Sequence, residues 1–388
     1  MKLGGRRSKL GSRRRLISLV AFAVAGLLLV VAACGGDDDQ AAPAPAPAAE
    51  PEAPAEVPAP EPEPEPAPEP APEPEPAPAP AEEPAEEPAE PANIAYLIGG
   101  LGNTFIDAQL DEAQKVAEAR GHNLEVIADE WDPVKQLALI EDALASGQYD
   151  AMVIEALDGQ SVCDVSLQVA EQMPVAVVTA PICGDDTLTE GTAVFSGRID
   201  FDDGKTMAEI VHQALGDDGG KIAYISGPTV LQIVQDQANG LKEGLAEYPE
   251  IELVTEVDGA YDPAVSLTAA EDILQANPDL DLIVAGADNM AEPAATAIEG
   301  AGKTGEVLLV GYGGTEGAFK LIEEGSMFGT LMLLPRQEAG NAVTVLIDTL
   351  EGKPVEQTVF LTKDDPSFEG NGNIVTSANV GKLTAQWK

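Results

Sequence analysis

Two stretches of the chain, DPVKQLALIEDAL at residues 132–144 and DPAVSLTAAEDIL at residues 262–274, carry the same residue at six matching positions. Both begin with Asp-Pro, and both lead into an apolar run. Aspartate is a favoured helix N-cap, and proline fits the first position of a helix because its missing N–H would have no partner there. We therefore predict helices at residues 133–146 and 263–276, capped by Asp132 and Asp262.

The repeat extends beyond these two helices. NIAYLIG at residues 93–99 is matched by KIAYISG at residues 221–227, and each is a short apolar run that ends in glycine. After each run, predicted helices and strands alternate. In the first half the helices are expected at 106–120, 133–146 and 160–172, with strands at 124–128, 151–155 and 175–179. In the second half the helices are expected at 237–247, 263–276 and 292–300, with strands at 252–257, 282–285 and 307–310.

Strict alternation of this kind requires right-handed crossovers and parallel sheets with helices on both faces. The sequence therefore predicts an α/β protein of two similar Rossmann-like lobes. Ligands of open parallel sheets bind outside the carboxyl ends of the strands. Two facing lobes would accordingly share one site in the cleft between them.

The N-terminal part has a different composition. Residues 1–33 hold seven Lys and Arg and no acidic residue, and they include an apolar run at 16–33. This pattern is typical of a secretory signal peptide. The run ends in VAACG, which resembles the bacterial lipoprotein cleavage box and implies lipidation of Cys34. An ordinary signal peptide with a chance cysteine is the alternative, and SRRRL at residues 12–16 leaves twin-arginine export open beside the general route.

Residues 34–92 form the expected linker. Between 41 and 92 the sequence is almost entirely Ala, Pro and Glu, with 20 of the chain's 31 prolines. Such a segment cannot bury a core and is expected to be a disordered but extended spacer of about 160 Å. It would hold residues 93–388 away from the outer face of the bacterial cytoplasmic membrane, to which the lipid on Cys34 anchors the chain.

Charge narrows the range of partners. Residues 93–388 contain 50 acidic side chains against 14 Lys and Arg. A surface this acidic is repelled by nucleic-acid phosphates and by anionic lipid headgroups. No further run of 18 apolar residues occurs, so the lipid is the only membrane anchor that we expect.

Several segments identify a family by resemblance. IAYLIGGLGNTF at residues 94–105, DNMA at 288–291, VGYGGT at 310–315 and NIVTSANV at 373–380 are similar, in order and spacing, to the type I periplasmic sugar-binding proteins, the ribose- and galactose-binding family that serves ABC importers. The resemblance implies a monomer whose lobes are joined by a three-strand hinge with crossings near Gly197, Leu333 and Phe360. Lobe I would comprise about 93–197 and 334–358, and lobe II about 198–333 and 359–388.

The family's binding positions can be placed on this sequence one by one. Several depart from the pattern of ribose binders, because Ala180, Ala287, Gly313 and Leu333 stand where polar or charged side chains are expected. The remaining candidates are aromatic platforms for a sugar face and polar groups for its hydroxyls. They are Asn103, Phe105, Trp131, Glu155, Thr179, Arg198, Gln235, Tyr261, Asp288 and Tyr312. Structural roles stay open for four of them: packing at helix starts for Trp131 and Tyr261, pairing with Asp200 for Arg198, and N-capping for Asp288.

The cysteines fit an exported protein. Besides Cys34 the chain has Cys163 and Cys183, which follow neighbouring strands of the predicted sheet. Thiols outside the cytoplasm pair, so we predict a disulfide between them. We expect no metal site, because His122 and His212 lie in unrelated places and neither is beside a cysteine.

Enzyme function is not expected. GLGNTF at residues 100–105 resembles a dinucleotide fingerprint, but Phe105 replaces its third glycine. The chain also lacks a Gly-x-Ser-x-Gly elbow and a phosphate-binding loop. We therefore expect no catalytic residue and no cofactor, with an exported Rossmann-type enzyme as a remote alternative.

The expected function is capture of a small polar ligand, most readily a sugar, for an ABC permease. The alternative is a surface sensor that presents a non-sugar small molecule to a receptor.

Overall fold

The computed structural model describes residues 90–355, 358–370 and 372–388, which belong to one compact unit spanning residues 81–388. The expected signal peptide, Cys34 and all but the last three residues of the expected linker lie outside the described residues. Within the described part, no helix combines the length and the apolar character that a bilayer span requires.

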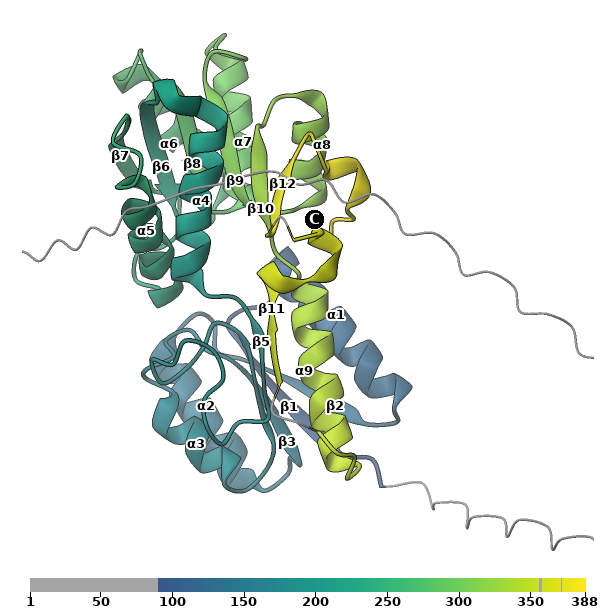
Figure 1. Cartoon of the computed structure of the whole chain (residues 1–388). Helices are drawn as coiled ribbons and strands as arrows, with labels where there is room; N and C mark the ends of the chain where they lie inside the picture. The colour runs from purple at the N-terminus through teal and green to yellow at the C-terminus, as the bar shows by residue number, and fades with distance from the viewer. Residues whose placement is uncertain (1–89, 356–357, 371) are drawn as a thin grey trace, which may run out of the picture. The chain divides into compact units, whose positions relative to one another are not determined.

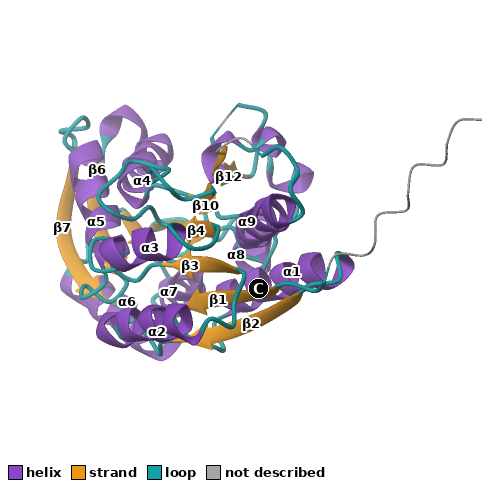
Figure 2. Cartoon of the chain, turned by 90° about the horizontal axis from the view of Figure 1, so that it is seen from below, coloured by secondary structure: helices purple, strands orange, loops and turns teal. Residues whose placement is uncertain are grey.

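Lobe I is built around a six-stranded sheet in which all neighbouring strands pair in parallel, in the order β11-β5-β4-β3-β1-β2 (Figure 1). Its strands are β1 (Asn93–Ile98), β2 (Asn123–Ala128), β3 (Ala151–Glu155), β4 (Val175–Thr179), β5 (Val194–Gly197) and β11 (Thr358–Leu361). Its helices are α1 (Thr104–Ala119), α2 (Pro133–Ser146), α3 (Cys163–Ala170) and α9 (Pro335–Leu350). Figure 2 shows these helices and strands from below.

Lobe II repeats the plan with the order β12-β10-β9-β8-β6-β7. Its strands are β6 (Gly220–Ser226), β7 (Ile251–Asp258), β8 (Leu282–Ala285), β9 (Leu308–Gly313), β10 (Gly329–Met332) and β12 (Ile374–Thr376). Its helices are α4 (Asp200–Leu215), α5 (Gln232–Leu245), α6 (Pro263–Ala276), α7 (Asp288–Gly300) and α8 (Glu316–Glu324). The prediction of two similar α/β lobes is confirmed. The sheet is not wholly parallel, because the edge strand β12 pairs antiparallel with β10.

The alternation of side chains along β1 shows how the core is divided. Ile94, Tyr96 and Ile98 belong to a cluster shared with α1 and α9, whereas Ala95 and Leu97 belong to a cluster shared with α2 and α3. Successive side chains of a strand point to opposite faces, so helices cover both faces of the sheet. The first cluster also includes residues of α4, α5 and β9, and it therefore continues from lobe I into lobe II.

The repeated Asp-Pro segments begin helices as predicted. The Asp132 carboxylate accepts hydrogen bonds from the backbone of Val134 and Lys135, and the Asp262 carboxylate does the same for Ala264 and Val265. Each proline stands at the start of its helix. The two residues before each aspartate have a positive φ in both lobes, and these are Glu130, Trp131, Ala260 and Tyr261. The internal repeat therefore includes, before each of the two helices, a turn with an unusual left-handed backbone conformation.

Four helices differ in their bounds from the prediction, and α1 begins two residues and ends one residue earlier than expected. The helix expected at 160–172 is the shorter α3, because the Asp158 carboxylate accepts hydrogen bonds from the backbone of Gln160 and Ser161 and holds them in a turn. Helices α5 and α7 begin earlier than predicted. In α7 the difference arises because Asp288 starts the helix while its side chain is engaged in the interior of the lobe.

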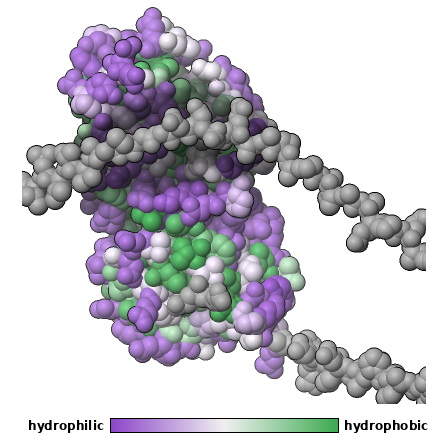
Figure 3. Space-filling view, in the orientation of Figure 1, coloured by the Kyte–Doolittle hydropathy of each residue, from purple (hydrophilic) through white to green (hydrophobic). Residues whose placement is uncertain are grey.

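The chain passes between the lobes at three places: between β5 and α4, between β10 and α9, and after β11. The last crossing follows Leu361, next to the crossing expected near Phe360, and lies a few residues beyond the expected lobe boundary at about 358. The reason is that Thr358–Leu361 pair with β5 in the sheet of lobe I. Figure 3 shows apolar side chains on the visible face of lobe I. Val359 and the 37% exposed Phe360 lie on the edge strand β11.

Helices α4 and α5 pack closely because glycines stand where they touch. A Cβ atom added to Gly240 would lie 1.9 Å from the carbonyl oxygen of Phe201, and one added to Gly204 would lie 2.1 Å from that of Gln237. No side chain fits at such distances, since real Cβ atoms stay outside about 3 Å of other heavy atoms. These two glycines set the distance between helices α4 and α5.

Candidate functional site

The carboxyl ends of β3 and β4 in lobe I face the start of α4 and α5 in lobe II across a cavity of about 760 Å³. The lining, which consists entirely of described residues, contains six aspartates and no lysine or arginine. These are Asp158, Asp185 and Asp186 of lobe I and Asp200, Asp202 and Asp236 of lobe II. The cleft therefore has a strongly negative potential, which disfavours anionic ligands.

Glu155, the last residue of β3, lies in a buried network of polar side chains. Its Oε1 accepts a hydrogen bond of 3.0 Å from the hydroxyl of Thr179, at the end of β4. The Thr179 hydroxyl in turn accepts a hydrogen bond of 3.0 Å from the amide of Gln109 on α1. The second carboxylate oxygen of Glu155 is buried and has no hydrogen-bond donor among the described residues, and unpaired buried acceptors are unfavourable.

Burial determines the protonation of Glu155, which is only 7% exposed. It raises the pKa of the carboxyl group to about 7, against the lowering effects of the Thr179 hydrogen bond and of the Arg198 charge. The nearby Glu338 raises the pKa further. At neutral pH the group exchanges between an acceptor-only carboxylate and a carboxylic acid that can also donate a hydrogen bond.

Arg198 follows β5 and lies at the centre of the interlobe region. Its guanidinium is 3.3 Å from Asp200 Oδ1 and 3.5 Å from Glu338 Oε1. It also stands over the ring of Phe105 at 5.3 Å and over that of Tyr312 at 5.9 Å, measured to the ring centroids. The pairing with Asp200, which the sequence left as an alternative to ligand binding, is present. Its position between rings from both lobes is a cation–π arrangement.

The aromatic candidates fall into two groups. Phe105 and Tyr312 lie at the interlobe region, where the Tyr312 hydroxyl donates a hydrogen bond of 2.7 Å to Asp203. Trp131 and Tyr261 each cover the glycine that follows the first strand of their lobe, because a Cβ at Gly99 or Gly227 would collide with those rings. These packing contacts agree with the structural alternative considered for both residues.

Three polar candidates have clear partners within their own lobes. The Asn103 side chain caps α1 by accepting from the backbone of Phe105 and Ile106. The exposed Gln235 donates to the carbonyl of Thr229. The fully buried Asp288 accepts from the backbone of Thr315 and the hydroxyl of Thr330. Burial raises the pKa of Asp288 to about 6, despite the hydrogen bond from Thr315. A role in binding for these three residues stays a prediction.

Two prominent residues of this region were missed in the sequence. Glu338, in the first turn of α9, is 2% exposed and contacts both Thr179 and Gln109. Trp387 meets the ring of Phe105 edge to face and donates a hydrogen bond to the carbonyl of Gly313. A signal for Glu338 exists, since it shares the buried helix face with Ala342 and Val345 at helical spacing. No local pattern marks Trp387.

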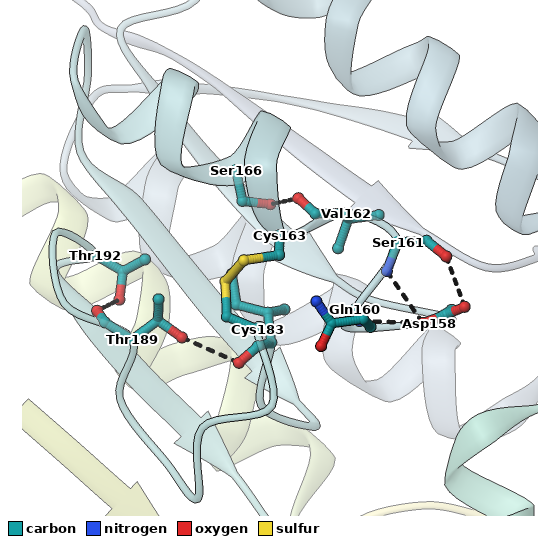
Figure 4. The surroundings of a disulfide bond; sticks show 10 residues. Asp158, Gln160, Ser161, Val162, Cys163, Ser166, Cys183, Thr189 and Thr192 are labelled. Atoms are coloured by element: carbon teal, nitrogen blue, oxygen red, sulfur yellow. Dashed lines mark hydrogen bonds between the residues drawn. A yellow bond between two sulfur atoms is a disulfide. The ribbon is translucent and has the colours of Figure 1, made fainter.

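The predicted disulfide is confirmed. Cys163 and Cys183 are bonded, with a Cα separation of 4.7 Å, and Figure 4 shows how the bond ties the start of α3 to the loop after β4. Beside it, the Thr189 hydroxyl donates to the carbonyl of Ile182. Asp158, Gly184 and Asp185, close to these cysteines in sequence, line the cleft. The bond therefore joins two cleft loops of lobe I.

No group of three or more His, Cys, Asp or Glu side chains arranged to hold a metal ion occurs among the residues that the structure describes.

Comparison with known proteins identifies the family. Residues 94–354 match the model of a family described as periplasmic binding protein domain. The chain belongs to this family, and its two mainly parallel α/β lobes have the type I fold.

Individual relatives agree with this assignment. The ribose import binding protein RbsB of Escherichia coli K12 is 27% identical over 266 residues, which cover 68% of this chain and 86% of the relative. The D-allose-binding periplasmic protein of the same organism is 32% identical over 145 residues, 37% of this chain and 47% of that protein.

Solved structures show the same fold. An ABC transporter periplasmic solute-binding protein of Actinobacillus succinogenes 130z with bound D-allose superimposes with a TM-score of 0.63, at 24% identity, covering 75% of this chain and all of that one. The Caulobacter myo-inositol binding protein gives a TM-score of 0.65 at 21% identity, covering 76% of this chain and 96% of its own.

Proposed function

We propose that this protein is the extracytoplasmic solute-binding component of an ABC importer, and that it captures a neutral sugar or sugar-like polyol between its two lobes. The relatives with which it shares most of its length are named for ribose import, and others are named for D-allose and D-apiose. All of them are named as binding proteins, and we assign no chemical step to the chain.

The observation that carries the proposal is the buried network at Glu155. The second carboxylate oxygen of Glu155 has no donor among the described residues, while Thr179, which itself accepts from Gln109, donates to the other oxygen. A sugar hydroxyl is a suitable donor, because it would satisfy the orphaned acceptor and accept hydrogen bonds at the same time. The aspartate-lined cleft would repel sugar phosphates and sugar acids, which is why we propose a neutral ligand.

The departures from ribose binders limit the choice further. Ala180, Ala287, Gly313 and Leu333 supply no charged side chain to clamp hydroxyl groups. We therefore expect the specificity to differ from that of a ribose binder. Phe105 and Tyr312 are buried and Arg198 stands over both rings, so the CH face of a hexose or a cyclic polyol could stack on them only if that side chain moved aside.

The delivery step follows from the N-terminal sequence. Lipidation of Cys34 would anchor the chain to the outer face of the cytoplasmic membrane, and residues 34–92 would let the closed lobes reach a permease. Closure would occur by bending at the three crossings, with the ligand shifting the population toward the closed form. The permease's own ATPase would supply the energy.

A ligand panel tests the proposal. We would titrate the protein with D-ribose, D-allose, D-apiose, D-fructose, D-galactose and myo-inositol, using thermal shift first and calorimetry for each compound that raises the midpoint. At least one neutral compound is expected to bind, and galactose 6-phosphate and galacturonate are expected not to bind. Binding confined to the anionic compounds would contradict the proposal.

The role of Glu155 is tested with the compound that binds best. Glu155→Gln should weaken its affinity by about 1.5–3 kcal/mol, the range for a hydrogen bond to a charged group. Glu141→Gln is the matched control, because Glu141 is an exposed carboxylate on α2 that does not line the cleft. Equal affinity of both variants and the wild type would remove Glu155 from the site.

A further inference from the structure

Each of the three interlobe crossings places one buried polar side chain in the same small region. Arg198 lies between β5 and α4, Glu338 lies in the first turn of α9 just after β10, and Thr362 follows β11 directly. All three are at least nine-tenths buried. They are far apart in sequence, and only the return of the chain between the lobes brings them together.

The carboxylate of Glu338 contacts both of the other crossings through one oxygen. Its Oε1 accepts a hydrogen bond of 3.1 Å from the Thr362 hydroxyl and lies 3.5 Å from Nη1 of Arg198. The Thr362 hydroxyl is also 3.2 Å from the carbonyl oxygen of Gly197, the last residue of β5. Any rotation of one lobe against the other must change the relative positions of these segments.

The second oxygen of the same carboxylate faces the candidate ligand site. Glu338 Oε2 lies 3.4 Å from the Thr179 hydroxyl and 3.4 Å from the amide nitrogen of Gln109. Thr179 is the residue that donates to Glu155. One hydroxyl proton cannot serve both carboxylates at once, so the hydrogen bond of Thr179 to Glu155 depends on where Glu338 stands.

The backbone supports a special role for this position. Thr179 has a φ of 71°, a conformation that a β-branched residue rarely adopts. A Cβ at Gly197 would lie 2.5 Å from the carbonyl oxygen of Thr179, so the first crossing rests directly on this strained residue. Movement at the crossing is therefore transmitted to the side chain that holds Glu155.

We propose that Glu338 is the positioning residue of the hinge, and that its carboxylate couples the three interlobe crossings to Glu155, which ends β3 directly before the cleft-lining Ala156 and Leu157. The inference rests on the proposed function in one respect, namely that binding proceeds by closure of the lobes. Glu338 need not touch the ligand. It fixes the arrangement of the two lobes, and through Thr179 it positions the carboxylate of Glu155.

The test measures the lobe arrangement without any ligand. In the full chain with Cys34→Ser, spin labels on Glu141→Cys of α2 and Glu271→Cys of α6 occupy equivalent exposed positions of the internal repeat. Pulsed electron resonance then gives the distribution of interlobe distances. Glu338→Gln keeps the size of the side chain but replaces one acceptor oxygen by a donor, which breaks the contacts on one side of the carboxylate.

We expect Glu338→Gln to widen and shift the interlobe distance distribution, and Thr362→Val to do the same to a smaller extent. Glu351→Gln is the control, because Glu351 lies at the other end of α9 and pairs with Arg120 and Lys353 within lobe I. Its distance distribution should match that of the wild type even if its unfolding midpoint falls.

A Glu338→Gln distribution that superimposes on that of the wild type would overturn the inference, whatever the change in unfolding midpoint. If Glu338→Gln does not fold, Thr362→Val decides in the same way. The measurement needs no sugar, so a failure of the ligand panel leaves it intact. Conversely, a sugar could bind to the wild type while Glu338→Gln and Thr362→Val keep the wild-type distance distribution. That result would support the proposed function and contradict the coupling through Glu338.

Discussion

The indole ring of Trp387 meets the phenyl ring of Phe105 edge to face, with 5.3 Å between the ring centroids. Phe105 belongs to α1 of lobe I, whereas the indole nitrogen of Trp387 donates a hydrogen bond of 2.9 Å to the carbonyl of Gly313 in lobe II. The Trp387 carbonyl accepts a hydrogen bond from the backbone of Glu316 in the same lobe. Trp387 is therefore bonded to lobe II and contacts lobe I at Phe105, while its neighbours Gln386 and Lys388 accept hydrogen bonds from Arg336 and Thr104 of lobe I.

This contact makes Trp387 a reporter of lobe movement. The chain has two tryptophans, so Trp131→Phe leaves Trp387 as the only tryptophan, and its emission is excited selectively over that of the tyrosines. A binding sugar should change the emission maximum or intensity of this variant, because closure alters the environment of the ring next to Phe105. In the converse variant, Trp387→Phe, the remaining Trp131 packs on Gly99 and Gly100 within lobe I, and its emission should change much less. A response only from Trp131 would place the ligand away from the interlobe region.

The protonation of Glu155 predicts how stability depends on pH. In the unfolded chain a glutamate loses its proton near its ordinary pKa of 4.5, whereas the folded protein holds it up to about 7. The folded state therefore binds more protons in this interval, and its stability falls as the pH rises from about 4.5 to about 7. The full effect of one such group is about 3 kcal/mol. Glu155→Gln should remove this part of the dependence.

Urea unfolding of the wild type and of Glu155→Gln at pH 5 and pH 8 checks this expectation. Asp203, whose pKa burial raises to about 7, contributes a dependence of the same sign in both proteins. The comparison between the two proteins isolates Glu155. Parallel pH profiles would show that the carboxyl group is ionised throughout and that its environment in solution is more polar than its burial indicates.

The disulfide between Cys163 and Cys183 is expected to stabilise lobe I. It closes a loop with a sequence separation of 20 residues, for which the chain-entropy estimate is about 3 kcal/mol. Cys163→Ser with Cys183→Ser should lower the free energy of unfolding by about this amount. The affinity for a verified ligand should also fall, because the joined loops line the cleft. Cys34→Ser, which leaves the bond between Cys163 and Cys183 in place, is the control in both measurements.

The two glycines between α4 and α5 predict a strong local effect of a single methyl group. Gly240→Ala should destabilise lobe II by about 1–3 kcal/mol, since the new Cβ would have to push the two helices apart. Gly300→Ala is the matched control. It also places alanine in a helix, but nothing lies within 4 Å of its Cβ, so it should be neutral or stabilising by up to about 1 kcal/mol. Equal unfolding midpoints for the two variants would contradict the close packing.

The parts of the fold that were predictable are those whose signals are local. Helices 133–146 and 263–276 have the predicted bounds because an aspartate cap and a proline mark their first turn. Strand β3 was also predicted with its correct bounds, because it begins with an uninterrupted apolar run. The polar network at Glu155 could not be predicted from local signals of this kind. Gln109 and Glu338 are 229 residues apart in sequence, and their contact exists only because the chain returns to lobe I after completing most of lobe II.

The position of β11 has a consequence for how the protein comes to be folded. Lobe I begins at the first described strand, yet its sheet receives its edge strand from Thr358–Leu361 and its helix α9 from Pro335–Leu350. During synthesis and export, the lobe that emerges first therefore remains incomplete until nearly the whole chain has followed. Its unfinished sheet edge, beside β5, is a surface on which strands of other chains could pair. A chaperone that shields this edge would act on lobe I for longer than on lobe II.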